Sequence, residues 1–69
     1  MRKITKSEVL AHIGSGNALT SFGAICVEMA RTLQRAINVG DVRVLLKALV
    51  REGAVEKQTR DNRLYYRKV

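Results

Sequence analysis

Apolar residues recur at helical spacing over three separate stretches of the chain, most regularly between residues 39 and 52. There they follow one another at i, i+3, i+4, i+7 and i+8, as Val42, Leu45, Leu46, Leu49 and Val50. This stripe predicts an amphipathic helix with one buried face. Asn38 can cap its first turn, Asp41 brings a negative charge to the positive end of the helix dipole, and Gly53 is expected to end it.

A shorter helix is expected near the N-terminus. Thr5 and Glu8 stand three positions apart, the spacing of a capping box in which the hydroxyl caps a backbone amide and the carboxylate reaches back. Ile4 and Val9 have the spacing of a hydrophobic staple. One apolar face follows, formed by Val9, Leu10 and Ile13. Gly14 is expected to stop this helix in a left-handed conformation.

Residues 20–37 carry the third helical pattern, with less regularity. Its apolar positions are Phe22, Ile25, Met29, Leu33 and Ile37. We predict one amphipathic helix over this stretch, capped by Thr20 or Ser21. The alternative is a brief strand near Ala24 followed by a shorter helix over residues 28–34.

The helical period disappears after Gly53. Two short runs, 54–59 and 64–69, flank the sequence Arg-Asp-Asn-Arg at residues 60–63. Asp and Asn tolerate the positive φ angles of a tight turn, and the tyrosines of the second run suit a pleated surface. A β-hairpin with a basic tip is therefore predicted. The expected fold class is mainly α with a small β-hairpin, as one domain over residues 1–69.

The composition adds a strong charge bias to this fold. The 69 residues contain 13 Lys and Arg against 6 Asp and Glu, a formal net charge of +7. Such an excess on a short chain favours a polyanionic partner, either nucleic acid or an anionic membrane surface. The alternative is a soluble protein that is merely basic.

Part of this positive charge lies on the outer face of the helix predicted over residues 39–52. With Val42 at zero on a helical wheel, Arg43, Lys47 and Arg51 lie near about 100°, 140° and 180°, on one outward line. Val44 and Ala48 add small apolar groups to the same face. A helix that enters a major groove needs this mixture, because long cations reach phosphates or guanine edges and small groups can touch thymine methyls. The alternative is an ordinary solvated face, but the nearest acidic residues project on the other flank.

The hairpin extends the basic surface. It carries Lys57, Arg60, Arg63, Arg67 and Lys68 within twelve residues. Arg60 and Arg63 flank the turn that holds Asn62, so all three are expected to reach a phosphate backbone or a minor groove. Charges that protect a strand edge from aggregation are the alternative explanation. Of the adjacent tyrosines, one is expected to pack on the preceding helix and the other to bond a phosphate.

The sequence LLKALVREGAVEKQTRDNRLYYRKV resembles the recognition helix and wing of winged helix-turn-helix proteins, and it is similar to the pattern of small bacterial ArsR- and MarR-like regulators. The resemblance implies a three-helix winged helix-turn-helix fold. It also implies a recognition helix at about 39–52 in the major groove and a wing at about 54–69 on the backbone or minor groove. The metal-binding cysteines of the metal-sensing relatives have no counterpart, so no metal-sensing role is implied.

The sequence contains no convincing set of catalytic or metal-binding residues. Cys26 is the single cysteine, which excludes an internal disulfide and a Cys-rich zinc site and fits a reducing cytoplasm. His12 has no second histidine, and Ser15 lacks the flanking residues of a phosphate-binding loop. The apolar stretch after Glu8 is only about six residues long, too short for an export signal. We expect a cytoplasmic protein, nucleoid-associated if it binds DNA, with no enzymatic activity, metal, cofactor or membrane partner.

The sequence therefore predicts a sequence-selective protein that binds double-stranded DNA, a small transcriptional regulator. The expected contact residues are Arg43, Val44, Lys47, Arg51, Arg60, Asn62, Arg63, Arg67 and Lys68. One such domain reads few base pairs, so a homodimer or a partner protein on the DNA is expected. Two alternatives stay open: a winged-helix interaction module that binds an acidic protein, such as a phage or mobile-element inhibitor or adaptor, and a protein that binds structured RNA.

Overall fold

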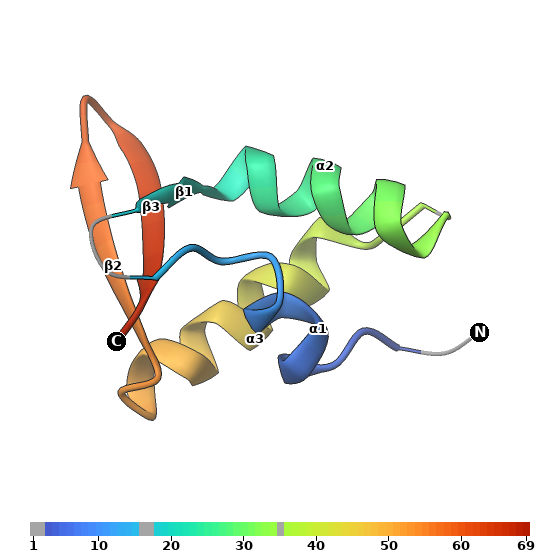
Figure 1. The fold of residues 1–69 in the computed structure, drawn as a ribbon, viewed down its shortest axis with the longest axis horizontal. Helices are drawn as coiled ribbons and strands as arrows, with labels where there is room; N and C mark the ends of the chain where they lie inside the picture. The colour runs from blue at the N-terminus through green and yellow to red at the C-terminus, as the bar shows by residue number, and fades with distance from the viewer. Residues whose placement is uncertain (1–2, 16–17, 35) are drawn as a thin grey trace.

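The computed structural model describes residues 3–15, 18–34 and 36–69. These residues form three helices and a three-stranded antiparallel sheet, an α+β arrangement (Figure 1). The elements in chain order are α1 (Lys6–Leu10), β1 (Thr20–Ser21), α2 (Phe22–Leu33), α3 (Val39–Arg51), β2 (Val55–Arg60) and β3 (Arg63–Lys68). The expected helices and hairpin are present, and β1 enlarges the hairpin to a sheet.

The sheet has the order β1-β3-β2, so β3 is its central strand. Thr20 pairs with Tyr66 at the short β1 edge, and Lys57 pairs with the same tyrosine from the β2 side. Beyond the sheet, the Lys68 amide donates to the Gly14 carbonyl at 2.7 Å. The end of β3 is thereby joined to the segment that follows α1.

The predicted capping box of α1 is confirmed. The Thr5 amide donates to Glu8 Oε1 at 2.9 Å, and the Glu8 amide donates to Thr5 Oγ1 at 3.2 Å. The prediction for Gly14 is wrong, because the helix ends earlier, at Ala11 in a right-handed conformation. Gly14 is instead required by a close approach: an added Cβ would lie 2.8 Å from the Cβ of Ala18.

α2 is one helix whose predicted N-cap is confirmed, but it ends earlier than predicted. Ser21 is its N-cap and accepts the Ala24 amide at 3.2 Å. The predicted continuation to Ile37 is wrong, because Gln34 adopts a left-handed conformation (φ 55°, ψ 40°) that ends the helix after Leu33. Ala24 itself is helical, and the short additional strand lies three residues earlier, where Thr20 and Ser21 pair with β3 before the helix begins.

The predictions for α3 are confirmed at both ends. Asn38 Oδ1 accepts the amides of Gly40 at 2.8 Å and Asp41 at 3.3 Å. Gly53 follows the helix with a φ of 81°. Lys6 and Glu52 form an ion pair that ties the start of α1 to the end of α3.

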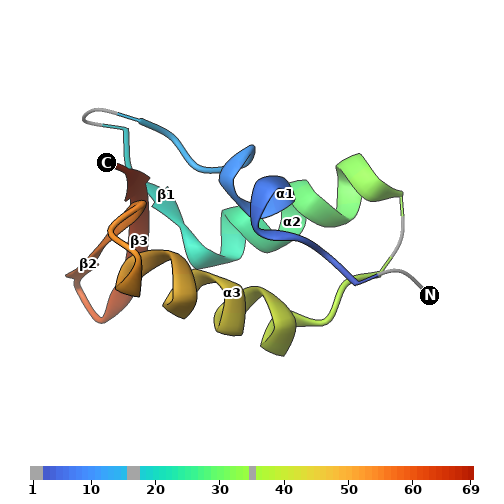
Figure 2. The ribbon, with the colours of Figure 1, turned by 90° about the horizontal axis from the view of Figure 1, so that it is seen from below.

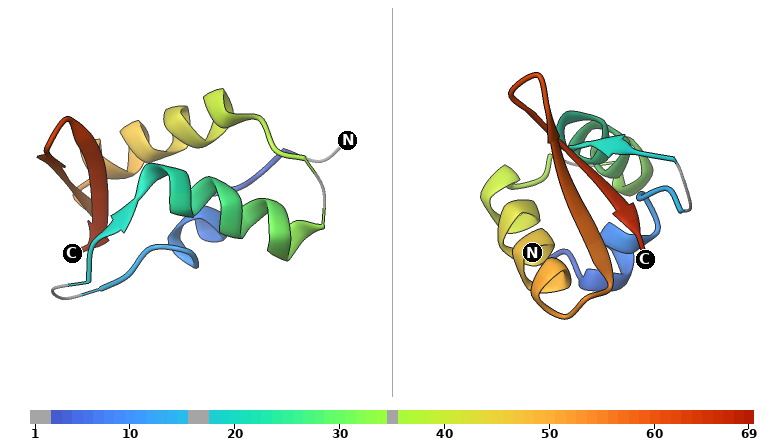
Figure 3. Two further views of the ribbon diagram at one scale, coloured as in Figure 1. Left: turned by 90° about the horizontal axis from the view of Figure 1, so that it is seen from above. Right: turned by 90° about the vertical axis from the view of Figure 1, so that its left-hand side faces the viewer.

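The core lies between the three helices and the inner face of the sheet. α1 packs against both α2 and α3, and the hairpin stands across one end of the helices, away from the N-terminus (Figures 2 and 3). The buried side chains are Val9, Ile13, Ile25, Met29, Val42, Leu46, Leu49, Val55 and Tyr66. No helix among the described residues has the length and apolar character needed to cross a membrane.

Candidate nucleic-acid interface

The outer face of α3 presents three cations in one row. Arg43, Lys47 and Arg51 are exposed, whereas the opposite face of the helix is buried in the core. The apolar stripe dictates this orientation, because burying it leaves the positions four residues apart in solvent. The structure thus brings together the three α3 cations that the sequence selected.

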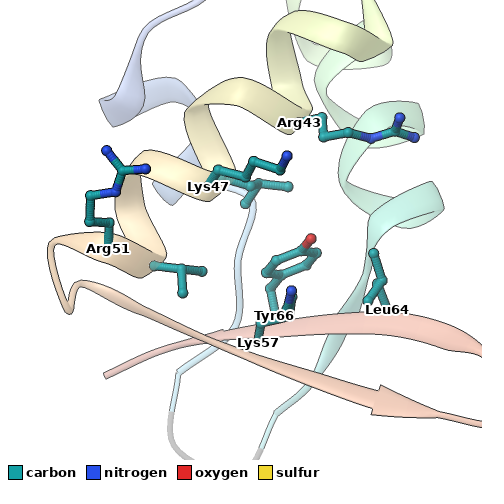
Figure 4. A pocket seen from close by; sticks show the side chains of 8 residues that line it. Arg43, Lys47, Arg51, Lys57, Leu64 and Tyr66 are labelled. Carbon is teal, nitrogen blue, oxygen red and sulfur yellow. The ribbon is translucent and has the colours of Figure 1, made fainter.

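These cations border a hollow of about 290 Å³ between α3 and the hairpin (Figure 4). Its lining residues are Arg43, Leu46, Lys47, Val50, Arg51, Lys57, Leu64 and Tyr66. The floor is apolar and the rim is cationic. In Figure 4 the Arg51 guanidinium extends away from Tyr66, while the Tyr66 hydroxyl points toward the α3 side of the hollow.

Arg43 is held in place by α2. Its Cζ lies 5.5 Å from the centroid of the Phe22 ring, a cation–π contact. Burial raises the pKa of the Tyr66 hydroxyl and of the Cys26 thiol, and the positive charge of Arg43 opposes both shifts. Both groups therefore stay protonated at neutral pH, and the Tyr66 hydroxyl can donate a hydrogen bond.

Lys57 is a site residue that the sequence reasoning counted as a hairpin cation but did not select. It lies directly opposite Tyr66 in the β2–β3 ladder, so both side chains project from the sheet face that looks toward α3. The signal was available, because Lys57 is two positions from the buried Val55 and strand residues alternate between faces.

The hairpin tip places two arginines side by side. Asp61 and Asn62 have φ angles of 50° and 64°, as a two-residue type I′ turn requires. This turn sets Arg60 directly opposite Arg63, with both side chains exposed. Like charges directly opposite each other in a ladder lower the stability of the hairpin. An anion bound at the tip would relieve this repulsion.

Arg63 and Asn62 also reach toward α2. Together with Leu64 they line a shallow hollow at the start of that helix, bounded on the other side by Ser21, Phe22 and Gly23. The tip and the Arg43 region are therefore connected through Phe22, which Arg43 contacts.

Arg67 and Lys68 lie apart from the hollow between α3 and the hairpin. Arg67 instead lines a separate hollow with Leu19, Gln58 and Arg60. Strand alternation turns Arg67 to the sheet face away from α3, where its Nη2 lies 2.6 Å from Glu56 Oε2. The hydrogen bond from Arg67, with a weaker one from Gln58, lowers the pKa of Glu56. Lys68 is half-buried at the end of β3 furthest from the tip.

Val44 lies on α3 beyond the row of cations, and 66% of it is exposed. It lines a separate hollow with Lys3, Ile4, Asp41 and Leu45. An exposed valine beside the cations fits an apolar contact to a base methyl, while the nearby Asp41 carboxylate disfavours a phosphate there.

Ion pairs leave most of this surface uncompensated. Those formed within the described residues join Lys6 to Glu52, Arg31 to Glu28 and Arg67 to Glu56. In the same part of the chain no carboxylate pairs with the cations of α3, the hollow or the tip. We call this set the open cations: Arg43, Lys47, Arg51, Lys57, Arg60 and Arg63.

The remaining reactive side chains have structural partners. His12 Nδ1 donates to the Glu8 carbonyl at 2.8 Å, and its Nε2 lies 3.1 Å from Thr32 Oγ1, so it links α1 to α2. Residues 3–15, 18–34 and 36–69 contain no cluster of His, Cys, Asp or Glu that could hold a metal ion.

Comparison of the chain with protein-family models, with curated proteins and with solved structures yields no match. Its function therefore has to be inferred from its own residues and their geometry.

Proposed function

We propose that this protein is a winged helix-turn-helix domain that binds double-stranded DNA with sequence selectivity and acts in transcriptional control. The observation that carries the proposal is the set of open cations on α3 and the adjoining hairpin, none of which forms an ion pair with a carboxylate among the described residues. A surface of this kind gains counterion-release free energy on a phosphate backbone.

α3 has the dimensions of a recognition helix. Its 13 residues extend for roughly 20 Å, and the B-DNA major groove admits an α-helix. Arg43 and Val44 are the residues we assign to base edges, since one is held in a fixed direction by Phe22 and the other is an exposed methyl-bearing side chain. Lys47 and Arg51 are assigned to phosphates.

The hairpin serves as the wing. Arg60, Asn62 and Arg63 sit at its tip, and the short turn holds them on a stiff two-stranded ribbon rather than on a loose loop. We assign these residues to the backbone or minor groove next to the site that α3 reads. Lys57 adds a phosphate contact between helix and tip.

The test is fluorescence anisotropy with duplex DNA, duplex RNA and single strands over a salt series, after selection of a target from randomised duplexes. We expect preferential binding to duplex DNA with a log–log salt slope of roughly −4 to −5, because the open cations other than Arg43, five in number, are assigned to phosphates. Arg31→Ala is the matched control, since Arg31 is an exposed arginine on α2 paired with Glu28. Absence of DNA binding near about 100 mM salt, or a preference for RNA, would overturn the proposal.

A second candidate is an interaction module for an acidic protein. The observation that favours it is the exposure of Val44 (66%) at the edge of the row of cations and of Leu64 (38%) beside the hollow, because exposed apolar side chains bordered by charged ones are typical of protein interfaces. Failure of the DNA titration combined with capture of one defined acidic partner, lost in Val44→Asp, would establish this candidate.

A further inference from the structure

The outer edge of β2 carries backbone groups that no other strand pairs with in the part of the chain that the structure describes. β2 borders the sheet on the side opposite β1, because the strand order is β1-β3-β2 (Figure 1). The Ala54 carbonyl accepts the Val69 amide at 3.1 Å, so the backbone of Ala54 faces β3. Since this direction alternates along an antiparallel strand, Val55, Lys57 and Thr59 turn their N–H and C=O groups outward.

An open edge of this length accepts a further strand unless something blocks it. β2 is six residues long, its ladder with β3 runs without a bulge, and the chain contains no proline. The protection that remains is charge, since Glu56, Lys57 and Arg60 carry charged side chains. These charges therefore decide which strand the edge can accept, and in which register.

We propose that the β2 edge pairs with the β2 edge of a second copy of this chain, antiparallel and about a two-fold axis at Gln58. The two sheets then form one continuous sheet across the pair. Lys57 lies opposite Thr59 of the second copy and exchanges backbone hydrogen bonds with it, which gives about four such bonds for the pair. Glu56 lies opposite Arg60 of the second copy, and their side chains share the sheet face away from α3.

Like charges exclude the neighbouring symmetric registers. Because outward-facing residues must pair with outward-facing residues, the axis passes through a residue rather than between two. An axis at Lys57 would set this lysine opposite its own copy, and an axis at Glu56 would do the same with two carboxylates. Centres further along the strand bring in Gly53, with a φ of 81°, or Asp61, with a φ of 50°, and neither continues an extended ladder. The axis at Gln58 is therefore the symmetric arrangement that sets opposite charges face to face.

The charges at the hairpin tip favour the same pairing. Arg60 faces Arg63 across the hairpin, a like-charge pair that lowers stability, and no carboxylate of the described residues forms an ion pair with Arg60. Glu56 of the second copy would supply that carboxylate from the open side of β2. It is ionised at neutral pH, because the hydrogen bond from Arg67 lowers the pKa of Glu56.

The association is expected to be weak. A contact between two single strands stays below the roughly 1,200 Å² at which standard interfaces begin, and the net charge of +7 on each copy opposes it. We expect a dimer with a Kd of about 0.1–1 mM at about 0.15 M salt, where much of the long-range repulsion is screened. This self-association goes beyond the proposed function and is measured without DNA, so failure of either proposal leaves the other in place.

The test is NMR of the ¹⁵N-labelled protein between about 0.05 and 2 mM at that salt concentration. We expect amide shifts in β2 that grow with concentration and are strongest at Lys57 and Thr59, together with slower diffusion. The amides of α1 should not respond.

A mixture of ¹³C-labelled and unlabelled protein identifies the register. We expect a contact between the α-protons of Glu56 in one copy and Arg60 in the other, because residues opposite each other in a non-hydrogen-bonded pair have Cα atoms about 4.5 Å apart. Within one copy these residues are four positions apart on a strand, about 13 Å, so the contact must come from the second copy.

Two charge-reversed variants test the pairing of Glu56 with Arg60. Arg60→Glu and Glu56→Arg should each raise the dimer Kd at least about fivefold, because each sets like charges opposite each other. An equimolar mixture of the two variants should restore association, since both contacts between the copies again join opposite charges. Arg63→Glu is the matched control, because it makes the same charge change at the tip but on β3, and it should keep the Kd within about twofold. A dispersed amide spectrum verifies that each variant is folded.

Several results would overturn the proposal: no concentration-dependent shift up to about 2 mM, shifts centred on another element, unchanged association in Arg60→Glu, or no restoration in the mixture. Contacts between the copies in a different register would also overturn it. Shifts of the same amides by an unrelated extended peptide, without any response to the concentration of the protein itself, would assign the edge to a foreign strand instead.

Discussion

Arg43 is the residue at which α2, α3 and β3 meet. Its guanidinium stacks over Phe22 at 5.5 Å, and its charge acts on both Cys26 and Tyr66. A long side chain normally loses rotamer entropy when it binds, but a guanidinium already held by an aromatic ring loses less. Arg43 is therefore better suited than Lys47 to read a base, whereas the freely exposed Lys47 suits a phosphate.

Substituting the two cations should separate specificity from affinity. Lys47→Ala should weaken binding to all duplexes about equally and reduce the salt slope by about 1, because it removes one phosphate contact. Arg43→Ala should cost about 1–3 kcal/mol and relax the preference at one base pair. Anisotropy titrations against a panel of single-base-pair variants measure both effects. Unchanged affinity in both variants would remove α3 from the interface.

The buried Tyr66 hydroxyl and the half-buried Cys26 thiol predict a loss of stability at alkaline pH. Burial raises the pKa of Tyr66 and of Cys26 in the folded protein, so the unfolded chain ionises first as the pH rises. Their contribution is fully present below the unfolded-state values, about 8.5 for Cys and 10 for Tyr, and is lost as the pH rises through the folded values. Urea unfolding between about pH 7 and 11 should show this decline. The double variant Tyr66→Phe/Cys26→Ala should have a flatter profile, and profiles of equal slope would contradict this prediction.

At the scale of elements, capping chemistry decided which boundaries could be predicted. Thr5 and Asn38 cap their helices with side chains that the sequence displays, and Gly53 supplies the expected positive φ. Gln34 ends α2 in a left-handed conformation, which glutamine rarely adopts, so the sequence did not predict this boundary. β1 is two residues long and exists only through its pairing with β3, a contact between positions far apart in the chain.

Two glycines should respond to alanine in opposite directions. Gly23 lies in α2, and an added Cβ would meet nothing within 4 Å, so Gly23→Ala should raise the free energy of unfolding by about 0.5–1 kcal/mol. Gly53 has a φ of 81°, which alanine adopts only with strain, so Gly53→Ala should lower it by about 1–2 kcal/mol. Chemical denaturation measures both, and a shift of equal sign would show that one of the local conformations is wrong.

Reversing one charge at the hairpin tip should stabilise the protein and weaken its binding to DNA. Arg60 and Arg63 face each other, so Arg63→Glu replaces a repulsive pair by an attractive one and should stabilise the protein by about 0.2–1 kcal/mol. The same change should weaken DNA binding and reduce the salt slope. Thermal unfolding and anisotropy on the same preparations test the two halves of this prediction, and undiminished DNA affinity would exclude the tip from the interface.

The charge swap Glu56→Arg/Arg67→Glu is the matched control for the tip. It preserves both the net charge and the cross-strand pair on the sheet face away from α3. We expect unchanged DNA affinity. A clear loss would return Arg67 to the interface, where the sequence first placed it.

At the scale of the whole molecule, the row of cations on α3 could be predicted from the sequence. Which hairpin cations join that row on one surface could not be predicted. A helix face follows from residue spacing alone, which is why Arg43, Lys47 and Arg51 were found together. Sorting the hairpin cations into two faces requires the register, because a shift of one residue moves every side chain to the other face. The two-residue turn at Asp61 and Asn62 fixes that register. Lys57 therefore projects from the sheet face toward α3, and Arg67, together with Arg60, projects from the other face.

The dimensions of the molecule bear on how it finds a target. One recognition helix reads only a few base pairs, which is too little information for selectivity in a genome. The Cα trace measures 32 × 24 × 19 Å, and successive turns of one DNA face are about 34 Å apart, so two copies fit on adjacent half-sites when the longest axis does not run along the DNA. We therefore expect two copies per target, on half-sites related by a two-fold axis.

Half-site spacing provides the sharpest test of this arrangement. Inserting about 5 bp between half-sites turns one of them to the opposite face of the duplex, so cooperative binding should be lost. Inserting about 10 bp returns both half-sites to the same face of the duplex. Binding of both copies should then recover, although with weaker contact between them. Sedimentation of protein–duplex mixtures gives the stoichiometry directly. Equal affinity and a single bound copy on all three duplexes would mean that this domain binds as a monomer, and that its selectivity has to come from a partner protein on the same DNA.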